Sequence, residues 1–174
     1  KNQLVGILAT IHVEISPFAP IREYGKGKGR HGIYYGRGFT QLTHDYNYRA
    51  ASSHFNVDLM GNPDLALEPE LSAKIFAWYW KGGTGNPSII PYAEKGDWDN
   101  VRSIVNAGHP GSINSCWGVP KFRKTIKLAI DNLQSGIIFN GELPPVSSNY
   151  GLGCVDGGDA PNRTFAAGFN PSTP

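Results

Sequence analysis

The sequence lacks the features that identify several large classes of protein. No window approaches the roughly 18 consecutive apolar residues that a membrane span needs, and no basic, apolar and cleavage segments of a signal peptide open the chain. Charge of one sign is not in large excess either, since the net charge is only +2, which does not by itself indicate a nucleic-acid partner. We therefore expect a soluble protein that binds neither membranes nor nucleic acids.

Cysteine is scarce, and histidine is not clustered. The two cysteines, Cys116 and Cys154, match no zinc or redox spacing, and the five histidines are dispersed, so we expect no metal and no cofactor. A disulfide between the cysteines would close a loop of about 38 residues and contribute roughly 4 kcal/mol. Two unrelated buried thiols are the alternative, but the sequon at residues 162–164 (Asn-Arg-Thr) favours a secreted, extracellular protein that carries the disulfide.

Glycine and proline, in contrast, are abundant. The 22 glycines and 13 prolines indicate many loops between short elements, in a chain of 174 residues that suits one hydrophobic core. From residue 136 onward periodic apolar positions are few. We expect one folded domain over residues 1–135, a Gly/Pro-rich tail over residues 136–174 that packs on the same domain, and a monomer.

Apolar residues recur every three or four positions in five stretches, which predicts a mainly α-helical fold. Asp97 is the expected N-cap of the fourth helix, and only residues 32–39 resemble a short β-hairpin. The five predicted helices cover residues 3–15, 40–54, 69–81, 97–107 and 118–133.

Glu14 is the first candidate catalytic residue. It follows Ile7 by seven residues and Ile11 by three, which places it on the apolar face of the first predicted helix. Ionising a carboxyl group among aliphatic side chains is costly, so the pKa of Glu14 should be raised, as a general acid near neutral pH requires. The alternative is a buried structural glutamate paired with a cation such as Arg22 or Arg37.

Glu23 is the second candidate, because the intervening Pro-Phe-Ala-Pro segment can reverse the chain and bring its carboxylate opposite Glu14. Glycoside hydrolysis uses such a pair of carboxyl groups, about 5–5.5 Å apart for retention and roughly 6.5–9.5 Å apart for inversion. The alternative is a solvated loop glutamate that balances nearby basic residues.

The stretch YYGRGFTQLTHDYNY combines glycines, aromatic rings and short polar side chains. Sugar rings require this mixture of stacking faces and hydrogen-bonding groups. The candidate substrate-binding residues here are Tyr35, Arg37, Gln41, Thr43 and Asn47.

These residues resemble a known family. YYGRGFTQLTHDYNYRAAS is similar to the YxGRGxxQLTxxxNY signature of family 19 chitinases and related endolysins of the lysozyme superfamily, and HVEISPFAPIREYG, DLALEPELSAKIFAWYW and GDWDNVRSIVNAG resemble further segments in the same order. The resemblance covers about residues 5–132. It implies a lysozyme-like, mainly α-helical (α+β) two-lobed domain with a small β-hairpin and an extended C-terminal tail.

The resemblance also implies roles for individual residues. Glu14 matches the family's general acid, and Glu23 corresponds to the region that supplies the second carboxylate, the base that activates water in inverting members. Asn106 matches a polar residue that lines the sugar cleft, as do Gln41 and Thr43. The chain begins inside what would be the acid-bearing helix, which suggests that an upstream module was removed.

Charge guides the expected substrate. Basic residues crowd the loops beside the predicted cleft and would favour an anionic polymer, so we expect a secreted muramidase (lysozyme) that cleaves peptidoglycan between N-acetylmuramic acid and N-acetylglucosamine. An endochitinase is the first alternative; a lytic transglycosylase and a non-catalytic carbohydrate-binding relative are the others. The basic residues are Arg22, Lys26, Lys28, Arg30 and Arg37.

Overall fold

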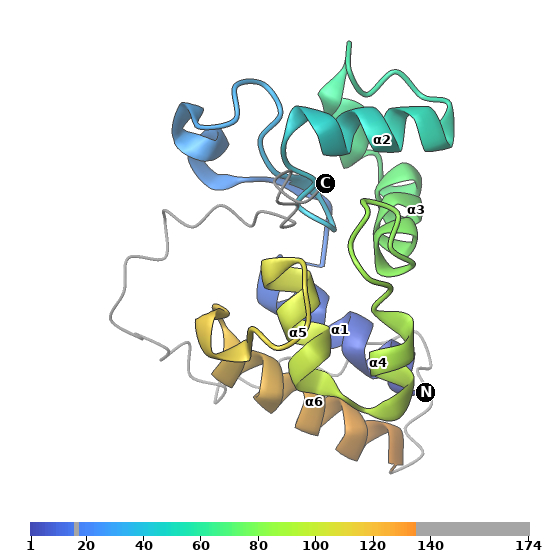
Figure 1. Cartoon of the computed structure of the whole chain (residues 1–174), viewed down its shortest axis with the longest axis vertical. Coiled ribbons are helices and arrows are strands. Elements are labelled where there is room, and N and C mark those ends of the chain that lie inside the picture. The colour runs from blue at the N-terminus through green and yellow to red at the C-terminus, as the bar shows by residue number, and fades with distance from the viewer. Residues whose placement is uncertain (16–17, 135–174) are drawn as a thin grey trace.

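The computed structural model of the chain describes residues 1–15 and 18–134 (Figure 1). Within them the chain is mainly helical with one small antiparallel sheet, which confirms the predicted lysozyme-like class. None of the described helices is both long and apolar enough to cross a bilayer. The α-helices are α1 (Asn2–Glu14), α2 (Asp45–Phe55), α3 (Pro69–Trp80), α4 (Ile90–Lys95), α5 (Trp98–Ala107) and α6 (Val119–Gln134); the strands are β1 (Ile21–Arg22) and β2 (Arg37–Gly38); the 3-10 helices are η1 (Tyr24–Gly29), η2 (Pro63–Leu67) and η3 (Ile113–Ser115).

The predicted tail, Cys154 and the sequon at Asn162 lie outside the described residues. The boundary at residue 135, the disulfide and the extracellular location therefore stay predictions from sequence. Cys116 is described: it is half-buried after η3, with its sulfur 3.2 Å from the carbonyl oxygen of Ser112.

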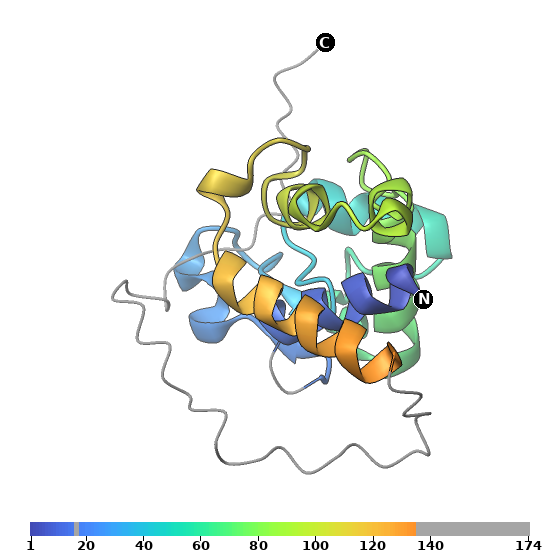
Figure 2. The same ribbon diagram turned by 90° about the horizontal axis from the view of Figure 1, so that it is seen from below.

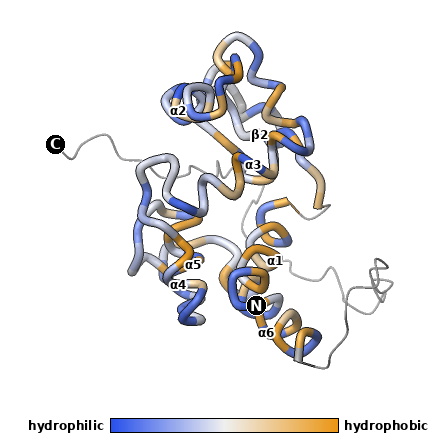
Figure 3. The backbone as a smooth tube through the Cα atoms, turned by 90° about the vertical axis from the view of Figure 1, so that its right-hand side faces the viewer, coloured by the Kyte–Doolittle hydropathy of each residue, from blue (hydrophilic) through white to orange (hydrophobic). Residues whose placement is uncertain are grey.

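The lower lobe in Figure 1 consists of α1, α4, α5 and α6, and Figure 2 shows α6 alongside α1. Apolar and polar stretches alternate along both helices in Figure 3, as expected of amphipathic helices that bury one face. The buried residues that these helices supply are Val5, Ala9, Val13, Ala93, Val101, Ile104, Phe122 and Ile126.

The upper lobe contains β1, β2, η1, η2 and α2, with a smaller core of its own (Figure 1). The helix α3 belongs to both cores. Its Ile75 packs in the upper core, whereas Phe76, Tyr79 and Trp80 pack in the lower one. One continuous helix therefore links the two lobes. The buried residues of the upper core are Leu42, Tyr48, Ala51, Leu59, Ala66 and Ile75.

The second helix begins later than predicted, at Asp45 instead of Thr40. Gln41 and His44 have φ angles of 51° and 72°, in the left-handed region that an α-helix cannot include. Arg37 and Leu42 instead exchange two backbone hydrogen bonds across a tight turn. The prediction that residues 40–44 belong to the helix is therefore wrong, and these residues form the turn before it.

The predicted hairpin within residues 32–39 is also wrong. β2 pairs antiparallel with β1, fifteen or so residues earlier in the chain, with Ile21 opposite Gly38 and Arg22 opposite Arg37. The pairing is long-range, because the glycine-rich segment between the strands winds into η1. It places Glu23, immediately after β1, against the segment that leads into β2.

Candidate active site

Glu14 is the last residue of α1, and its side chain is only 5% exposed. Its Oε1 accepts a hydrogen bond from Nη1 of Arg102, a residue of α5 whose side chain is completely buried. The helix that the sequence predicted does carry this carboxyl group into an apolar region. Its cationic partner, however, is neither Arg22 nor Arg37.

Arg102 is fixed from a second side as well. Its Nε and Nη2 both donate to the carbonyl oxygen of Trp117, at 2.9 and 2.6 Å, and its guanidinium carbon lies 6.0 Å from the centre of the Phe122 ring. Three segments, α5, the chain before α6 and α6 itself, thus hold the guanidinium in place. The guanidinium that binds Glu14 is therefore held by contacts with two other segments.

Burial raises the pKa of Glu14 above its ordinary value, because desolvation penalises the carboxylate. Arg102 and the more distant Lys121 act in the opposite direction and lower the same pKa, but burial is the largest cause. The direction agrees with the expectation from sequence. A carboxyl group in this setting can hold a proton near neutral pH and donate it.

Asn106 supports this arrangement from the last turn of α5. Its Oδ1 accepts a hydrogen bond of 3.1 Å from the backbone N–H of Trp117, the residue whose carbonyl binds Arg102. The predicted contact of Asn106 with substrate stays a prediction. What the structure adds is a chain of contacts from Asn106 through Trp117 and Arg102 to Glu14.

Glu23 is half-buried and is bound to Gly36 twice. Its backbone N–H donates to the Gly36 carbonyl at 2.7 Å, and its Oε2 accepts from the Gly36 N–H at 2.9 Å. A Cβ atom at Gly36 would lie 2.9 Å from Gln41 Oε1 and 3.2 Å from Glu23 Cβ, so the close approach requires glycine. Glu23 is therefore an oriented side chain and not a freely solvated one.

The polar residues after β2 form a hydrogen-bonded ladder, and all three of its side chains are buried. Gln41 Nε2 donates to the carbonyls of Ile21 and Gly38, each at 3.0 Å. Thr43 Oγ1 donates to the Gln41 carbonyl, and Asn47 Nδ2 to the Thr43 carbonyl. These atoms organise the loop beside Glu23, and a contact of Gln41, Thr43 or Asn47 with a sugar stays a prediction.

Arg37 and Tyr35 form a second buried unit in the upper lobe. The Arg37 guanidinium lies 3.8 Å from the centre of the Tyr35 ring and donates to the Tyr35 carbonyl and the Tyr48 hydroxyl. Its Nε donates to Asp64 of η2 at 2.7 Å, and Asp64 also accepts from Arg22 at 2.8 Å. Asp64 therefore binds two of the five basic residues on which the expectation of an anionic substrate rested, and its single negative charge offsets one of their two positive charges.

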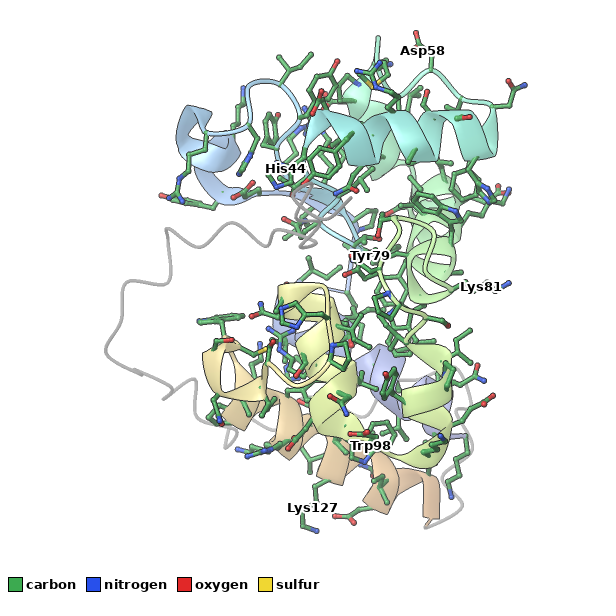
Figure 4. All side chains as sticks on the ribbon, in the orientation of Figure 1. His44, Asp58, Tyr79, Lys81, Trp98 and Lys127 are labelled. Carbon is green, nitrogen blue, oxygen red and sulfur yellow. The ribbon has the colours of Figure 1, made fainter. Side chains whose placement is uncertain are left out.

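A small pocket lies beside Glu14, between α1, α3 and the turn that follows β2. Glu14 lines it from α1, and Phe39 and Thr40, which follow β2 directly, line it from the upper lobe. Tyr79 of α3 also lines it, and Figure 4 shows this residue where the two lobes meet. Glu14 lines this pocket, and Glu23 does not; that the two carboxyl groups face one substrate stays a prediction. Within the described residues, no group of three or more potential metal ligands occurs.

Two functional partners were missed from the sequence, Arg102 and Asp64. Arg102 precedes Val105 by three residues and thus lies about 60° from it around the helix, so a helical-wheel plot could have placed it beside the apolar face. Asp64 gave no such signal. Its position depends on long-range packing of η2 against β2, which no local pattern reports.

Comparison with known proteins places this geometry in context. The sequence model of a family described as "Chitinase class I" matches residues 19–111, a range that includes Glu23 and Asn106 and begins five residues after Glu14. An endochitinase of Pisum sativum is 39% identical over 80 residues, which are 45% of this chain and 25% of the relative.

Two further relatives give similar figures. Chitinase 8 of Oryza sativa subsp. japonica is 39% identical over 80 residues, which are 45% of this chain and 31% of the relative. Endochitinase 1 of Theobroma cacao is 33% identical over 112 residues, which are 63% of this chain and 32% of the relative. The chain thus spans about a quarter to a third of the length of these relatives. No solved structure matches it.

Proposed function

The chain belongs to the class I chitinase family of glycoside hydrolases, and from this premise we propose that it hydrolyses the β-1,4 bonds of a chitin-type polymer of N-acetylglucosamine. The observation that carries the proposal is the buried carboxyl group of Glu14, which binds Arg102 and lines a pocket that Phe39 and Thr40, just after β2, also line. The names of the relatives, all chitinases or endochitinases, support the choice of polymer.

In the proposed reaction Glu14 is the general acid. Its proton goes to the glycosidic oxygen as the bond to the anomeric carbon breaks, and the leaving sugar departs with a free hydroxyl group. Burial raises the pKa of the carboxyl group and so favours its protonated form, and the guanidinium of Arg102 stabilises the carboxylate that forms. The same contact aims the carboxyl group, because Arg102 donates a hydrogen bond to Oε1.

Glu23 is the proposed general base. The Gly36 N–H holds its Oε2 and thereby leaves the other carboxylate oxygen to accept a proton from the attacking water. Attack of that water on the anomeric carbon would invert its configuration. Tyr24, which follows Glu23 and is 79% exposed, offers an aromatic face on which a sugar ring can stack.

The muramidase that the sequence suggested is the second candidate. It rested on a basic cleft, and Asp64 offsets Arg22 and Arg37 there, so the charge contrast is smaller than expected. Exposed Lys26 and Arg30 still favour an anionic polymer to some degree. The chitin-type substrate has the better support, since the named relatives are chitinases.

Product analysis tests the proposal. The chain is incubated with chitin oligosaccharides and, separately, with purified peptidoglycan, and the soluble products are identified by mass spectrometry. We expect shortened N-acetylglucosamine oligomers from the first substrate, and we expect Glu14→Gln and Glu23→Gln each to reduce the rate by about 10²- to 10⁴-fold. Glu70→Gln on the surface of α3 is the matched control and should retain the full rate, because the Glu70 side chain is exposed and pairs with Lys74 at the surface.

Each other result has a distinct meaning. Muropeptides with a reducing muramic acid end would show that the protein is a muramidase. Muropeptides with an anhydro end would show that it is a transglycosylase. Binding without turnover, unchanged in Glu14→Gln, would make it a carbohydrate-binding relative. A silent Glu23→Gln with an intact fold would remove Glu23 from the mechanism.

A further inference from the structure

The pocket beside Glu14 contains buried polar groups that the proposed reaction does not use. Three polar atoms of the residues that line it, Thr10 Oγ1, Thr40 Oγ1 and Trp80 Nε1, have no hydrogen-bond partner among the described residues. Thr10 is only 2% exposed and Trp80 equally buried. Buried polar groups of this kind are nearly always hydrogen-bonded, so each requires a partner.

The local alternatives are not in use. A threonine inside a helix can donate to the carbonyl four residues earlier, as Thr125 does to Lys121 in α6, but Thr10 in α1 does not. Thr40 lies on the opposite wall, in the turn after β2. The residues that carry the unpartnered groups thus line one small pocket from α1, from the β2–α2 turn and from α3.

The size of that space identifies its occupant. Its volume is about 10 Å³. That is roughly the accessible space of one water molecule, and a buried water needs two to four polar partners. The residues that line the pocket carry three unpartnered polar atoms and one carboxyl group, enough for the partners of one water molecule.

We propose that this pocket binds a single ordered water molecule, held by the side chains of Thr10, Thr40 and Trp80 and hydrogen-bonded to the carboxyl group of Glu14. Thr10 and Thr40 are then positioning residues, which act on the general acid through the water. The water site itself does not depend on the proposed hydrolase activity; only its effect on catalysis does.

The water has a predictable electrostatic effect. A water that donates to the carboxylate stabilises its charged form and so offsets part of the desolvation caused by burial. The other groups that act on Glu14 are Arg102 from α5, Lys121 from α6, Tyr79 from α3 and Cys116 after η3. None of these changes when a threonine hydroxyl is removed. Loss of the water should therefore raise the pKa of Glu14 and move the alkaline limb of the pH–rate profile to higher pH.

The test compares Thr10→Val and Thr40→Val with Thr10→Ser and with Thr84→Val. The serine variant keeps the hydroxyl group, and Thr84 is a further buried threonine with an unpartnered hydroxyl that does not line this pocket. A high-resolution crystal structure of the unsubstituted chain should show solvent density within about 3.2 Å of both Thr10 Oγ1 and Thr40 Oγ1. We expect this density to be absent in Thr10→Val and present in Thr10→Ser.

Two solution measurements complete the test. In both valine variants the alkaline limb should move up by about half a pH unit or more, whereas Thr10→Ser and Thr84→Val should match the unsubstituted chain. The melting temperature should fall in Thr10→Val, because the other groups that bind the water would lose their hydrogen-bond partner. A dry pocket, with no density and a higher melting temperature once the unpaired hydroxyl is gone, would overturn the proposal. If the chain proved inactive, the density and the melting temperature would still decide between these outcomes.

Discussion

Glu14 of α1 and Arg102 of α5 form a buried ion pair. Two opposite charges, both nearly inaccessible to solvent, contribute little net stability, because desolvation of each offsets their attraction. Such a pair is therefore weak evidence of a structural role. A pair that aims a carboxyl group and tunes its pKa is consistent with the acid role proposed for Glu14.

Arg102→Met tests whether the guanidinium orients Glu14 and lowers its pKa. Because Arg102 lowers the pKa of Glu14, its removal should raise that pKa further and move the alkaline limb of the pH–rate profile to higher pH. The loss of orientation should reduce kcat/KM by about 10- to 100-fold, and the broken buried pair should cost about 3 kcal/mol of stability. Steady-state kinetics across pH and denaturant unfolding measure these effects.

Arg123→Met is the matched control, since Arg123 pairs with Asp99 on the exposed surface. It should change neither the pH limb nor kcat/KM. An Arg102→Met variant that kept both its rate and its pH limb would show that the clamp does not act on Glu14. Arg102→Lys should restore part of the rate, because the charge returns without the two-sided hydrogen bonding.

At the scale of elements, the pairing of β1 with β2 fixes the second carboxylate. Gly36→Ala tests this, because the new methyl group would meet Gln41 Oε1 at 2.9 Å and Glu23 at 3.2 Å. We expect a loss of stability of about 1–2 kcal/mol and a fall in kcat as Glu23 is displaced. Activity assays and thermal unfolding measure the two effects.

Gly32→Ala separates these two effects. Gly32 has a φ of 55° and no neighbour within 4 Å of an added Cβ, so alanine there costs backbone strain alone. The two variants should lose similar stability, but only Gly36→Ala should lose activity. Equal activity in both would mean that the position of Glu23 does not matter.

Some of the helices could be predicted from the sequence, and others could not. Helices with clear periodicity and strong caps were predicted well: α5 begins after Asp97, whose side chain accepts from the Asn100 N–H, and ends at Gly108 with a φ of 81°. The short α4 was missed, since six residues hold too few apolar positions for a period. The left-handed residues that delay α2, and the long-range partner of β2, depend on tertiary contacts that no local pattern contains.

Among the site residues, Glu14 was predictable because a charge on an apolar helical face is anomalous in any sequence. Its partner on a distant helix was not, since α1 and α5 meet only in the folded chain. Gln41, Thr43 and Asn47 could be selected from the sequence as polar residues of the candidate site. Their hydrogen bonds to the backbone carbonyls of Gly38, Gln41 and Thr43 could be seen only in the folded structure.

At the scale of the whole molecule, Asp64 joins three parts of the upper lobe by binding Arg22 of β1 and Arg37 of β2 from η2. These two arginines hold the pKa of Asp64 below its ordinary value of 3.8. A lowered carboxyl pKa gives stability that is present above the unfolded value and is lost as pH falls through the folded value. Burial of Glu14 has the opposite sign, with stability lost as pH rises from 4.5 through its folded pKa.

Asp64→Asn isolates the first effect. At neutral pH it should cost about 1 kcal/mol, because the Asp64 side chain is 48% exposed and solvent screens the pair. The difference from the unsubstituted chain should shrink as pH falls below about 4 and vanish at lower pH. Urea unfolding at a series of pH values measures it. A difference that stayed constant down to pH 2 would mean that the charge of Asp64 contributes nothing.

The place of α3 in both cores has a consequence for insertions and deletions. Ile75 packs in the upper core, and Tyr79, about one turn further along the same side of the helix, packs in the lower one. A single residue added between them would rotate one anchor by about 100° and shift it by about 1.5 Å relative to the other. An insertion within α3 should therefore disturb the packing of both lobes at once, whereas an insertion in an exposed loop should leave both cores intact.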